Sequence, residues 1–267
     1  MVPLFGLIIA LYAWPVINIL WLGVSDPELG LQNYELLFTK SSLVKILWTT
    51  IRVCLITTLF SVVIGYLIAY TMVHLVGRER NWMLTLVLIS FWVSVLVRAF
   101  SWLTLLGRNG LVNAALVGSG LAEEPLSMIR NEFGVLIGMV HYMVPYAVLP
   151  LLANMQGIDH RVMDASRSLG AGPLLTFVRI YLPLTKPGVI ASSLLVFIIS
   201  LGFYVTPALL GGGRVLMVAE YVSVQILITV QWGVAAMLAT LLLSGVFALL
   251  YIMSRFMKIG EVFGARP

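Results

Sequence analysis

The sequence is poor in charge, in cysteine and in histidine. Only 10% of its 267 residues are charged, against about 25% in a typical soluble domain. By contrast 61% are hydrophobic, and the mean hydropathy is +1.05. This composition excludes a soluble globular protein and predicts an all-α membrane protein that crosses the bilayer several times. The one cysteine, Cys54, lies in an apolar stretch, so no disulfide can form within the chain.

The sequence also lacks the usual patterns of enzymatic chemistry. It has no G-x-x-x-x-G-K-[ST] loop to hold nucleotide phosphates, and its three histidines are far apart. An intramembrane protease would pair His141 as general base with a nucleophile such as Ser119. However, Gly118-Ser119-Gly120 lacks the residue that such proteases place between glycine and serine, and it falls in a loop. We therefore predict no catalytic residue, no metal site and no bound cofactor, and we interpret His141 as a hydrogen-bonding residue between helices.

The formal net charge of +5 does not indicate nucleic-acid binding. The basic residues are scattered around the ends of apolar stretches, where a membrane protein ordinarily carries them, and they form no patch. We therefore predict the lipid bilayer, and no nucleic acid, as the surroundings of this chain.

Six apolar stretches have the length of a membrane-spanning helix, which needs about 20 residues. The predicted spans are residues 3–24, 53–73, 82–106, 134–155, 189–210 and 233–257. Pro145 and Pro150 are expected to interrupt the fourth span. No internal repeat and no soluble domain is evident, so residues 1–267 are interpreted as a single membrane domain.

Lysine and arginine are unevenly distributed between the predicted loops. If the turn at 77–81, the segment 156–188 and the C-terminal tail share one side, that side holds most of the basic residues. The opposite side carries an excess of acidic residues, among them Glu123, Glu124 and Glu132. Because basic loops stay in the cytoplasm, we predict that segment 156–188 and both termini are cytoplasmic.

Segment 156–188, here called the coupling loop, carries helix signals in a polar setting. Asp159 is a good N-cap and Gly170 a good C-terminal stop, since glycine adopts the left-handed conformation without strain. Gly172-Pro173 would restart a helix, and Leu182-Pro183 would end it. The coupling loop is therefore predicted to form two short helices joined by a sharp turn. A partner protein could bind this pair of helices.

The spacing of residues in the coupling loop resembles a known signature. Asp164-Ala165-Ser166, three residues, Gly170, nine residues and then Ile180-x-Leu182-Pro183 is similar to the EAA loop of permease subunits in binding-protein-dependent ABC importers. The family has Glu-Ala-Ala where this chain has Asp-Ala-Ser, and all spacings agree. Fragments elsewhere resemble the spermidine/putrescine-type permeases, the PotB branch more than the PotC branch. They include Gly65-Tyr66-Leu-Ile-Ala69-Tyr70 and Tyr204-Val-Thr206-Pro207.

This resemblance implies a type I (MetI-like) importer permease with six transmembrane helices in the inner membrane. It implies four kinds of partner: a second, homologous permease, two copies of an ATPase, an external solute-binding protein and the bilayer. ATP and Mg²⁺ would bind the ATPase and not this chain. The residues that it implies for contact with the ATPase are Asp164, Ala165, Ser166, Arg167, Gly170, Ile180, Leu182 and Pro183. A helix pair seated in a groove of the ATPase would transmit the closure of the ATPase dimer to the permease.

The substrate path is predicted from the chemistry of the cargo that the resemblance implies. Polyamines are flexible polycations, which bind to aromatic faces and carboxylates. The candidate path residues are Tyr142, Tyr146, Phe203, Tyr204 and Glu220, although aromatic residues at such positions also serve as core or interfacial residues. Another small solute, such as an opine or an amino-acid-like compound, remains an alternative cargo.

Two arginines lie in or beside apolar stretches, and each has two interpretations. Arg52 and Arg98 either extend to a lipid headgroup or face a partner or a water-filled cavity. For Arg98 the second interpretation is a structural role on the external side. No ladder of acidic residues runs through the spans, which weakens the alternative of a stand-alone secondary transporter without excluding it.

Overall fold

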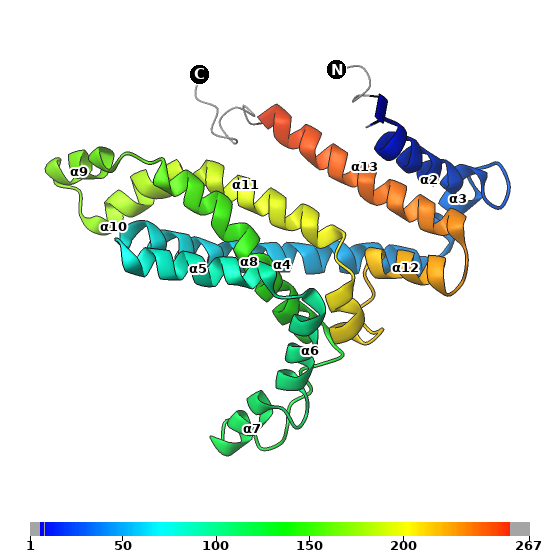
Figure 1. Ribbon diagram of the computed structural model, residues 1–267, viewed down its shortest axis with the longest axis horizontal. Coiled ribbons are helices and arrows are strands. Elements are labelled where there is room, and N and C mark those ends of the chain that lie inside the picture. The colour runs from blue at the N-terminus through cyan, green and yellow to red at the C-terminus, as the bar shows by residue number, and fades with distance from the viewer. Residues whose placement is uncertain (1–5, 8, 257–267) are drawn as a thin grey trace.

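The computed structural model describes residues 6–7 and 9–256 as an elongated bundle of helices (Figure 1), with no β-strand among these residues. Three five-residue stretches, η1, η2 and η3, are π-helical. The elements are η1 (Ile9–Ala13), α2 (Trp14–Ser25), α3 (Gln32–Thr39), α4 (Ser41–His74), α5 (Arg78–Trp92), α6 (Val95–Leu106), α7 (Leu111–Gly118), α8 (Glu132–Gln156), α9 (His160–Ser168), α10 (Pro173–Thr176), η2 (Phe177–Tyr181), α11 (Leu182–Leu201), η3 (Pro207–Gly211), α12 (Val218–Leu227) and α13 (Trp232–Phe256).

The centre of the bundle consists of α4, α8 and α11. α4 packs against α8, and α11 packs against both. The approach of α4 to α8 is close at Gly65, where an added Cβ atom would lie 2.8 Å from the Cβ atom of Ala147. Such contacts leave no room for a larger side chain, so the three helices form one tightly packed unit, here called the central seam.

Among the residues that the structure describes, four helices are long and apolar enough to cross a membrane, or five if the bent pair α5 and Val95–Gly118 forms one span. The four are Ser41–His74, Glu132–Gln156, Pro173–Leu201 and Trp232–Arg255. The predicted spans 53–73 and 134–155 lie within the first two, and 189–210 and 233–257 overlap the last two. The predicted first span includes residues outside the described part, and its described portion, Ile9–Ser25, is a shorter apolar helix. The count of six spans therefore stays a prediction.

The predicted span 82–106 is not one straight helix. α5 and the helical stretch from Val95 to Gly118 meet at an angle of 98°. The helix ends at Trp92, Val93 is extended, and Ser94 precedes α6. No proline or glycine marks this break, so the hydropathy of the stretch could not reveal it.

The expected effects of three prolines are wrong. Pro145 and Pro150 lie inside α8, which is continuous. Pro183 does not end a helix: it stands in the first turn of α11, and the chain stays helical from Pro173 to Leu201. Prolines are tolerated in such helices because neighbouring helices and local π-helical turns satisfy the carbonyl groups that proline leaves unpaired, and the π-helical η2 directly precedes α11 here.

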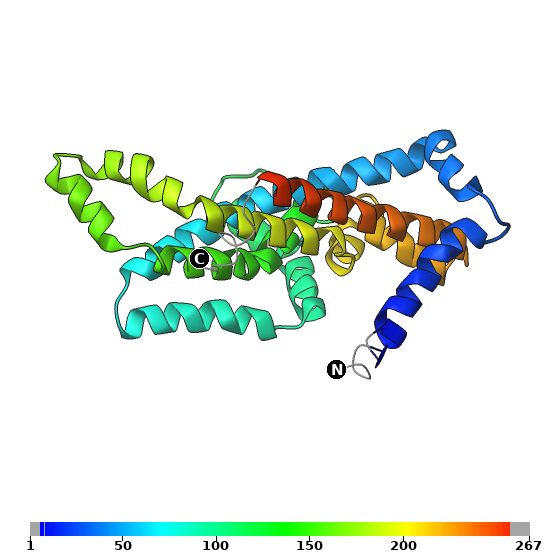
Figure 2. The same ribbon diagram turned by 90° about the horizontal axis from the view of Figure 1, so that it is seen from above.

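The two ends of the bundle consist of different helices. α9, α10 and the turn from α4 to α5 lie together at one end, and α3 and α12 lie at the other (Figures 1 and 2). α6 and α7 project sideways from the bundle between these ends. The coupling loop and the basic turn at Arg78 and Arg80 therefore share one end, as the distribution of charge predicts, and the C-terminal tail that was predicted to lie with them is outside the described residues.

Candidate functional site

The coupling loop forms a helical hairpin whose start and turn match the sequence signals. The Asp159 side chain accepts a hydrogen bond from the backbone N–H of Arg161 at 2.9 Å and caps α9. Gly170 follows α9 with φ of +85°, a conformation that side-chain-bearing residues rarely adopt. Gly172 and Pro173 then start α10. The sharp reversal between α9 and α10 therefore depends on Gly170.

A buried polar contact holds the two arms of the hairpin together. The hydroxyl oxygens of Ser166 and Thr176 lie 3.0 Å apart, and both side chains are buried. On the same side of α9, Met163 is buried in a cluster with Tyr181 and with residues of α4 and α8. Ser166 is thus placed to shape the hairpin from inside, and a partner would not touch it directly.

The outer surface of α9 is polar and exposed. Asp164 and Arg167 lie one helical turn apart, with 3.8 Å between carboxylate and guanidinium, and both are largely exposed to solvent. Ala165 and Gly170 are exposed beside them, and so is Leu169. An ion pair this exposed adds little to stability, so both charges remain available for contacts with another protein.

The last part of the signature lies on the second arm. Ile180 is half-buried against the cluster around Tyr181, whereas Leu182 and Pro183 are exposed. The signature residues thus divide into an exposed outer group and an inner group, in which Ser166 joins the two arms of the hairpin and Ile180 packs against the cluster shared with α4 and α8. The outer group is Asp164, Ala165, Arg167, Gly170, Leu182 and Pro183, and the inner group is Ser166 and Ile180.

The structure brings three of the five predicted path residues together. Tyr142 and Tyr146 of α8 are stacked with ring centroids 5.7 Å apart, and Phe203, between α11 and η3, lies 4.5 Å from Tyr142. Phe91 of α5 adds an edge contact to Tyr146 at 4.8 Å. These four rings, here called the aromatic cluster, come from three separate parts of the chain.

Tyr204 and Glu220 are placed differently. Tyr204 is 48% exposed and is not part of the aromatic cluster. Glu220 lies on α12, which packs against α13 and α4, and it is 8% exposed. Its Oε2 atom has no hydrogen-bond partner among the described residues, and burial raises the pKa of Glu220 to about 7. Glu220 is therefore a carboxyl group that exchanges a proton near neutral pH.

Arg98, for which the sequence left two interpretations open, also belongs to this site. The Arg98 guanidinium of α6 lies 4.8 Å from the ring centroid of Tyr142, and the side chain is only 6% exposed. Arg98 therefore faces the inside of the protein, which decides between the two interpretations of this arginine. Arg52 likewise has a partner, because it pairs with Glu132 of α8. In the sequence, the only indication that Arg98 or Arg52 has a partner inside the protein was its position in or beside an apolar stretch.

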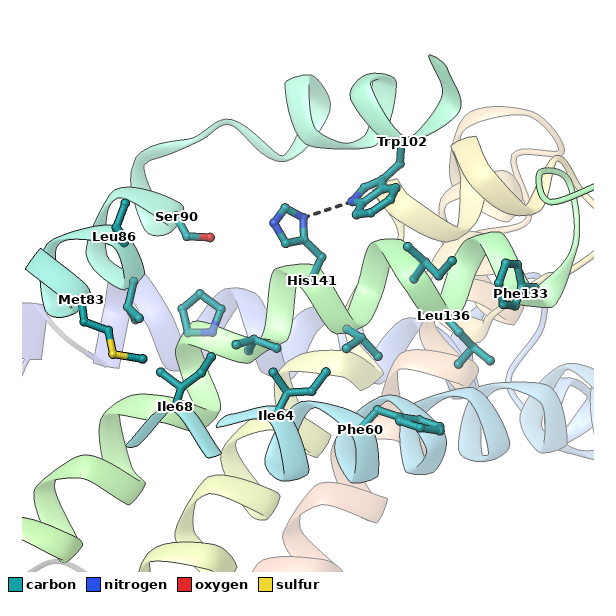
Figure 3. A pocket seen from close by; sticks show the side chains of 15 residues that line it. Phe60, Ile64, Ile68, Met83, Leu86, Ser90, Trp102, Phe133, Leu136 and His141 are labelled. Carbon is teal, nitrogen blue, oxygen red and sulfur yellow. Dashed lines mark hydrogen bonds between the residues drawn. The ribbon is translucent and has the colours of Figure 1, made fainter. Parts of the chain in front are cut away.

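A cavity beside α8 is unsuitable for a charged cargo. It has a volume of about 750 Å³, lies between α4, α5, α6 and α8 (Figure 3), and is lined by no aspartate, glutamate, lysine or arginine. Its polar contact is a hydrogen bond from Trp102 Nε1 to His141 Nδ1 at 3.1 Å, so His141 does hydrogen-bond between helices, as an acceptor. In the described part of the chain, no three histidine, cysteine or acidic residues gather as a metal site would need.

Sequence comparison identifies the group of proteins to which these features belong. The sequence profile of the family described as "Binding-protein-dependent transport system inner membrane component" matches residues 61–258. The spermidine/putrescine transport system permease protein PotB of Haemophilus influenzae is 33% identical over 76% of this chain and 70% of its own. PotB of Escherichia coli is 32% identical over 78% of this chain and 76% of its own.

Solved structures give the same fold. A chain of a bacterial ABC transporter involved in the import of alginate superposes with a TM-score of 0.73 at 16% identity, over 95% of this chain and 93% of that one. An amino acid ABC transporter gives a TM-score of 0.57 at 14% identity, over 84% and 96%. These likenesses support the all-helical permease fold, and the family is one of transport subunits and not of enzymes. The chain is a multi-pass membrane protein that belongs to the family of inner membrane components of binding-protein-dependent ABC importers.

Proposed function

We propose that this chain is one of two permease subunits of an ATP-driven importer for a polyamine such as putrescine or spermidine. The observation that carries this proposal is the helical hairpin at one end of the bundle, with an exposed polar face and a glycine turn, in a chain homologous to PotB permeases. In this proposal the hairpin and both termini are cytoplasmic, and the second permease is a homologous, non-identical chain.

In the proposed complex, each permease places its hairpin in a groove of one of two ATPase copies. Asp164 and Arg167 make the polar contacts, and Gly170 and Pro183 fix the shape of the joint. An external solute-binding protein delivers the cargo, a role supported by the likeness to an alginate transporter solved with its substrate-loaded periplasmic protein, at a TM-score of 0.75. ATP binding then draws the hairpins together and tilts the central seams.

The aromatic cluster is the proposed site for the ammonium groups of the cargo. Aromatic faces bind alkylammonium ions by cation–π attraction, at about 2 kcal/mol where water is excluded. Tyr142, Tyr146 and Phe203 offer such faces, with the phenol oxygens of Tyr142 and Tyr146 3.5 Å apart. Tyr204 and Glu220 are proposed to act outside the cluster, closer to the external entrance.

The test is uptake of radiolabelled putrescine and spermidine by vesicles that contain the complete importer. We expect uptake that needs ATP and all subunits, whereas vesicles with this chain alone should be inactive. Uptake by the chain alone would establish a secondary transporter instead. ATP-dependent uptake of an opine or amino acid, without uptake of polyamines, would replace the proposed cargo and leave the permease role intact.

A further inference from the structure

Arg98 places a positive charge inside the site proposed for a positively charged cargo. Its guanidinium lies over the ring of Tyr142, 4.8 Å from the centroid, and the side chain is 6% exposed. Among the residues that the structure describes, the two ion pairs are Arg52–Glu132 and Arg167–Asp164, so no described carboxylate neutralises Arg98. A buried charge without a counter-ion is costly unless other groups stabilise it.

Backbone carbonyl groups provide part of that stabilisation. Nη2 of Arg98 donates hydrogen bonds to the carbonyl oxygens of Ser90 and Val93, the latter at 3.4 Å. These carbonyls lie at and just beyond the C-terminal end of α5, where the chain turns through 98° into α6. A cation is favoured at the C-terminal end of a helix. Arg98 therefore connects the break between α5 and α6 to the aromatic cluster on α8.

Two cations cannot share the covered face of Tyr142. At a separation of about 5 Å, two unit charges still repel each other strongly at the effective dielectric constant of a partly buried site. This repulsion exceeds what a single cation–π contact contributes. An ammonium group of the cargo can thus use this face of Tyr142 only when the guanidinium has left it.

We propose that Arg98 is a resident cation, which occupies the face of Tyr142 until an ammonium group of the cargo displaces it. This inference rests on the proposed function and adds a specificity-determining residue to it. A cavity of about 330 Å³ beside Arg98, lined also by Ser101, Trp102 and His141, gives the guanidinium a place to move.

The exchange has two consequences. First, a cargo must outcompete a guanidinium, which favours polyamines because their further ammonium groups gain additional contacts. Second, a guanidinium that leaves Tyr142 for this cavity, which Ser90 and Val93 also line, must rearrange its hydrogen bonds to their carbonyl groups, so binding of the cargo perturbs the break between α5 and α6. The substrate site and a hinge of the permease are coupled through one side chain.

The first experiment measures binding of radiolabelled putrescine to the assembled permease–ATPase complex in nanodiscs. The solute-binding protein is omitted because its own affinity would mask that of the permease. We expect Arg98→Gln to tighten binding by roughly 3- to 10-fold, since the cargo no longer displaces a cation. Arg98→Lys, which keeps the charge, should bind like the wild type, and so should Arg108→Gln, which removes an exposed arginine beyond the end of α6.

Unchanged or weaker binding by Arg98→Gln would overturn the proposal and reduce Arg98 to a structural residue. Because that variant could fail to assemble, hydrogen exchange of the wild-type complex gives a second test. Putrescine should increase exchange of the backbone amides at 90–98, and no change there would equally overturn the proposal. Uptake by the wild-type importer tests the proposed function separately, so the two failures are distinguishable.

Discussion

The central seam and the hairpin of the coupling loop illustrate two ways of using a helix. In the central seam, α4 and α8 approach so closely that a single methyl group at Gly65 would collide with Ala147. In the hairpin, α9 buries Met163 and Ser166 but leaves Asp164, Ala165 and Arg167 exposed. The glycine of the hairpin, Gly170, has no atom within 4 Å of where a Cβ atom would lie.

This contrast indicates that the two regions depend on glycine for different reasons. Gly65 is required for space, because two helices meet there. Gly170 is required for conformation, because the backbone turns left-handed there. Substitutions in the central seam should therefore affect folding, and substitutions in the hairpin should affect communication with a partner.

The largest expected effect is at the helix contact in the central seam. Gly65→Leu should prevent α4 from packing on α8 and should abolish folded, monodisperse protein, since overpacking of a tight core costs about 1–3 kcal/mol or more. The matched control is Gly245→Leu on α13, where no atom lies within 4 Å of the added Cβ position. Fluorescence-detected size-exclusion chromatography measures how much of each variant is folded and monodisperse. Equal elution profiles for the two variants would contradict the role of Gly65 in the contact between α4 and α8.

The second prediction concerns the turn of the hairpin. Gly170→Asp should insert and fold normally but should lower ATP-dependent uptake by more than about 10-fold, because strain of about 1–3 kcal/mol moves the outer residues out of register with the ATPase. The control is Gly172→Asp, since Gly172 has φ of −69° and stands at an N-cap position where aspartate is favoured. Normal uptake by an assembled Gly170→Asp transporter would refute the role of the hairpin.

A smaller effect is expected from the contact between the two arms of the hairpin. Ser166→Ala leaves the buried Thr176 hydroxyl without its partner and should lower uptake about 2- to 5-fold, corresponding to roughly 1 kcal/mol. The double variant Ser166→Ala/Thr176→Val removes both hydroxyls and should recover part of the loss. Additive losses in the double variant would mean that the two hydroxyls act independently.

The smallest effect concerns Glu220 and depends on pH. The pKa of Glu220 is raised above its ordinary value, so the folded state binds the proton more tightly than the unfolded state. The stability that this proton contributes is therefore complete only below the ordinary pKa of 4.5 and is lost as the pH rises through about 7. From pH 6 to pH 8, thermal unfolding should show a loss on the order of 1 kcal/mol in the wild type that is absent in Glu220→Gln. Parallel curves for the two proteins would show that Glu220 is ionised throughout.

Local sequence signals were sufficient to predict the start of the hairpin and its turn. The caps at Asp159, Gly170 and Pro173 were readable because each acts within a few residues of its own position. Pro183 was misread as a stop because the π-helical turn η2, which precedes it, has no sequence signature. The break after Trp92 could not be read at all, because a bend of 98° in an apolar segment depends on what packs on either side.

In the candidate site, too, the sequence indicated which residues matter but not how they come together. The aromatic residues were selected by type, but their gathering involves α5, α8 and the connection between α11 and η3, which are distant in sequence. Arg98 was visible as an unusual residue, yet its position over Tyr142 follows from the bend between α5 and α6. No periodicity within one helix could have predicted which ring a charged side chain would cover.

The sequence by itself determined that this is a membrane protein, roughly where most of its helices run, and which loop carries the spacing of an importer permease. Hydropathy, capping and motif spacing act along the chain, so they can be read from it. Only the tertiary structure decided which glycine serves packing and which serves a turn, which rings gather, and what Arg98 faces. Those outcomes depend on contacts between helices far apart in sequence, and the packing of such helices is a property of the whole bundle.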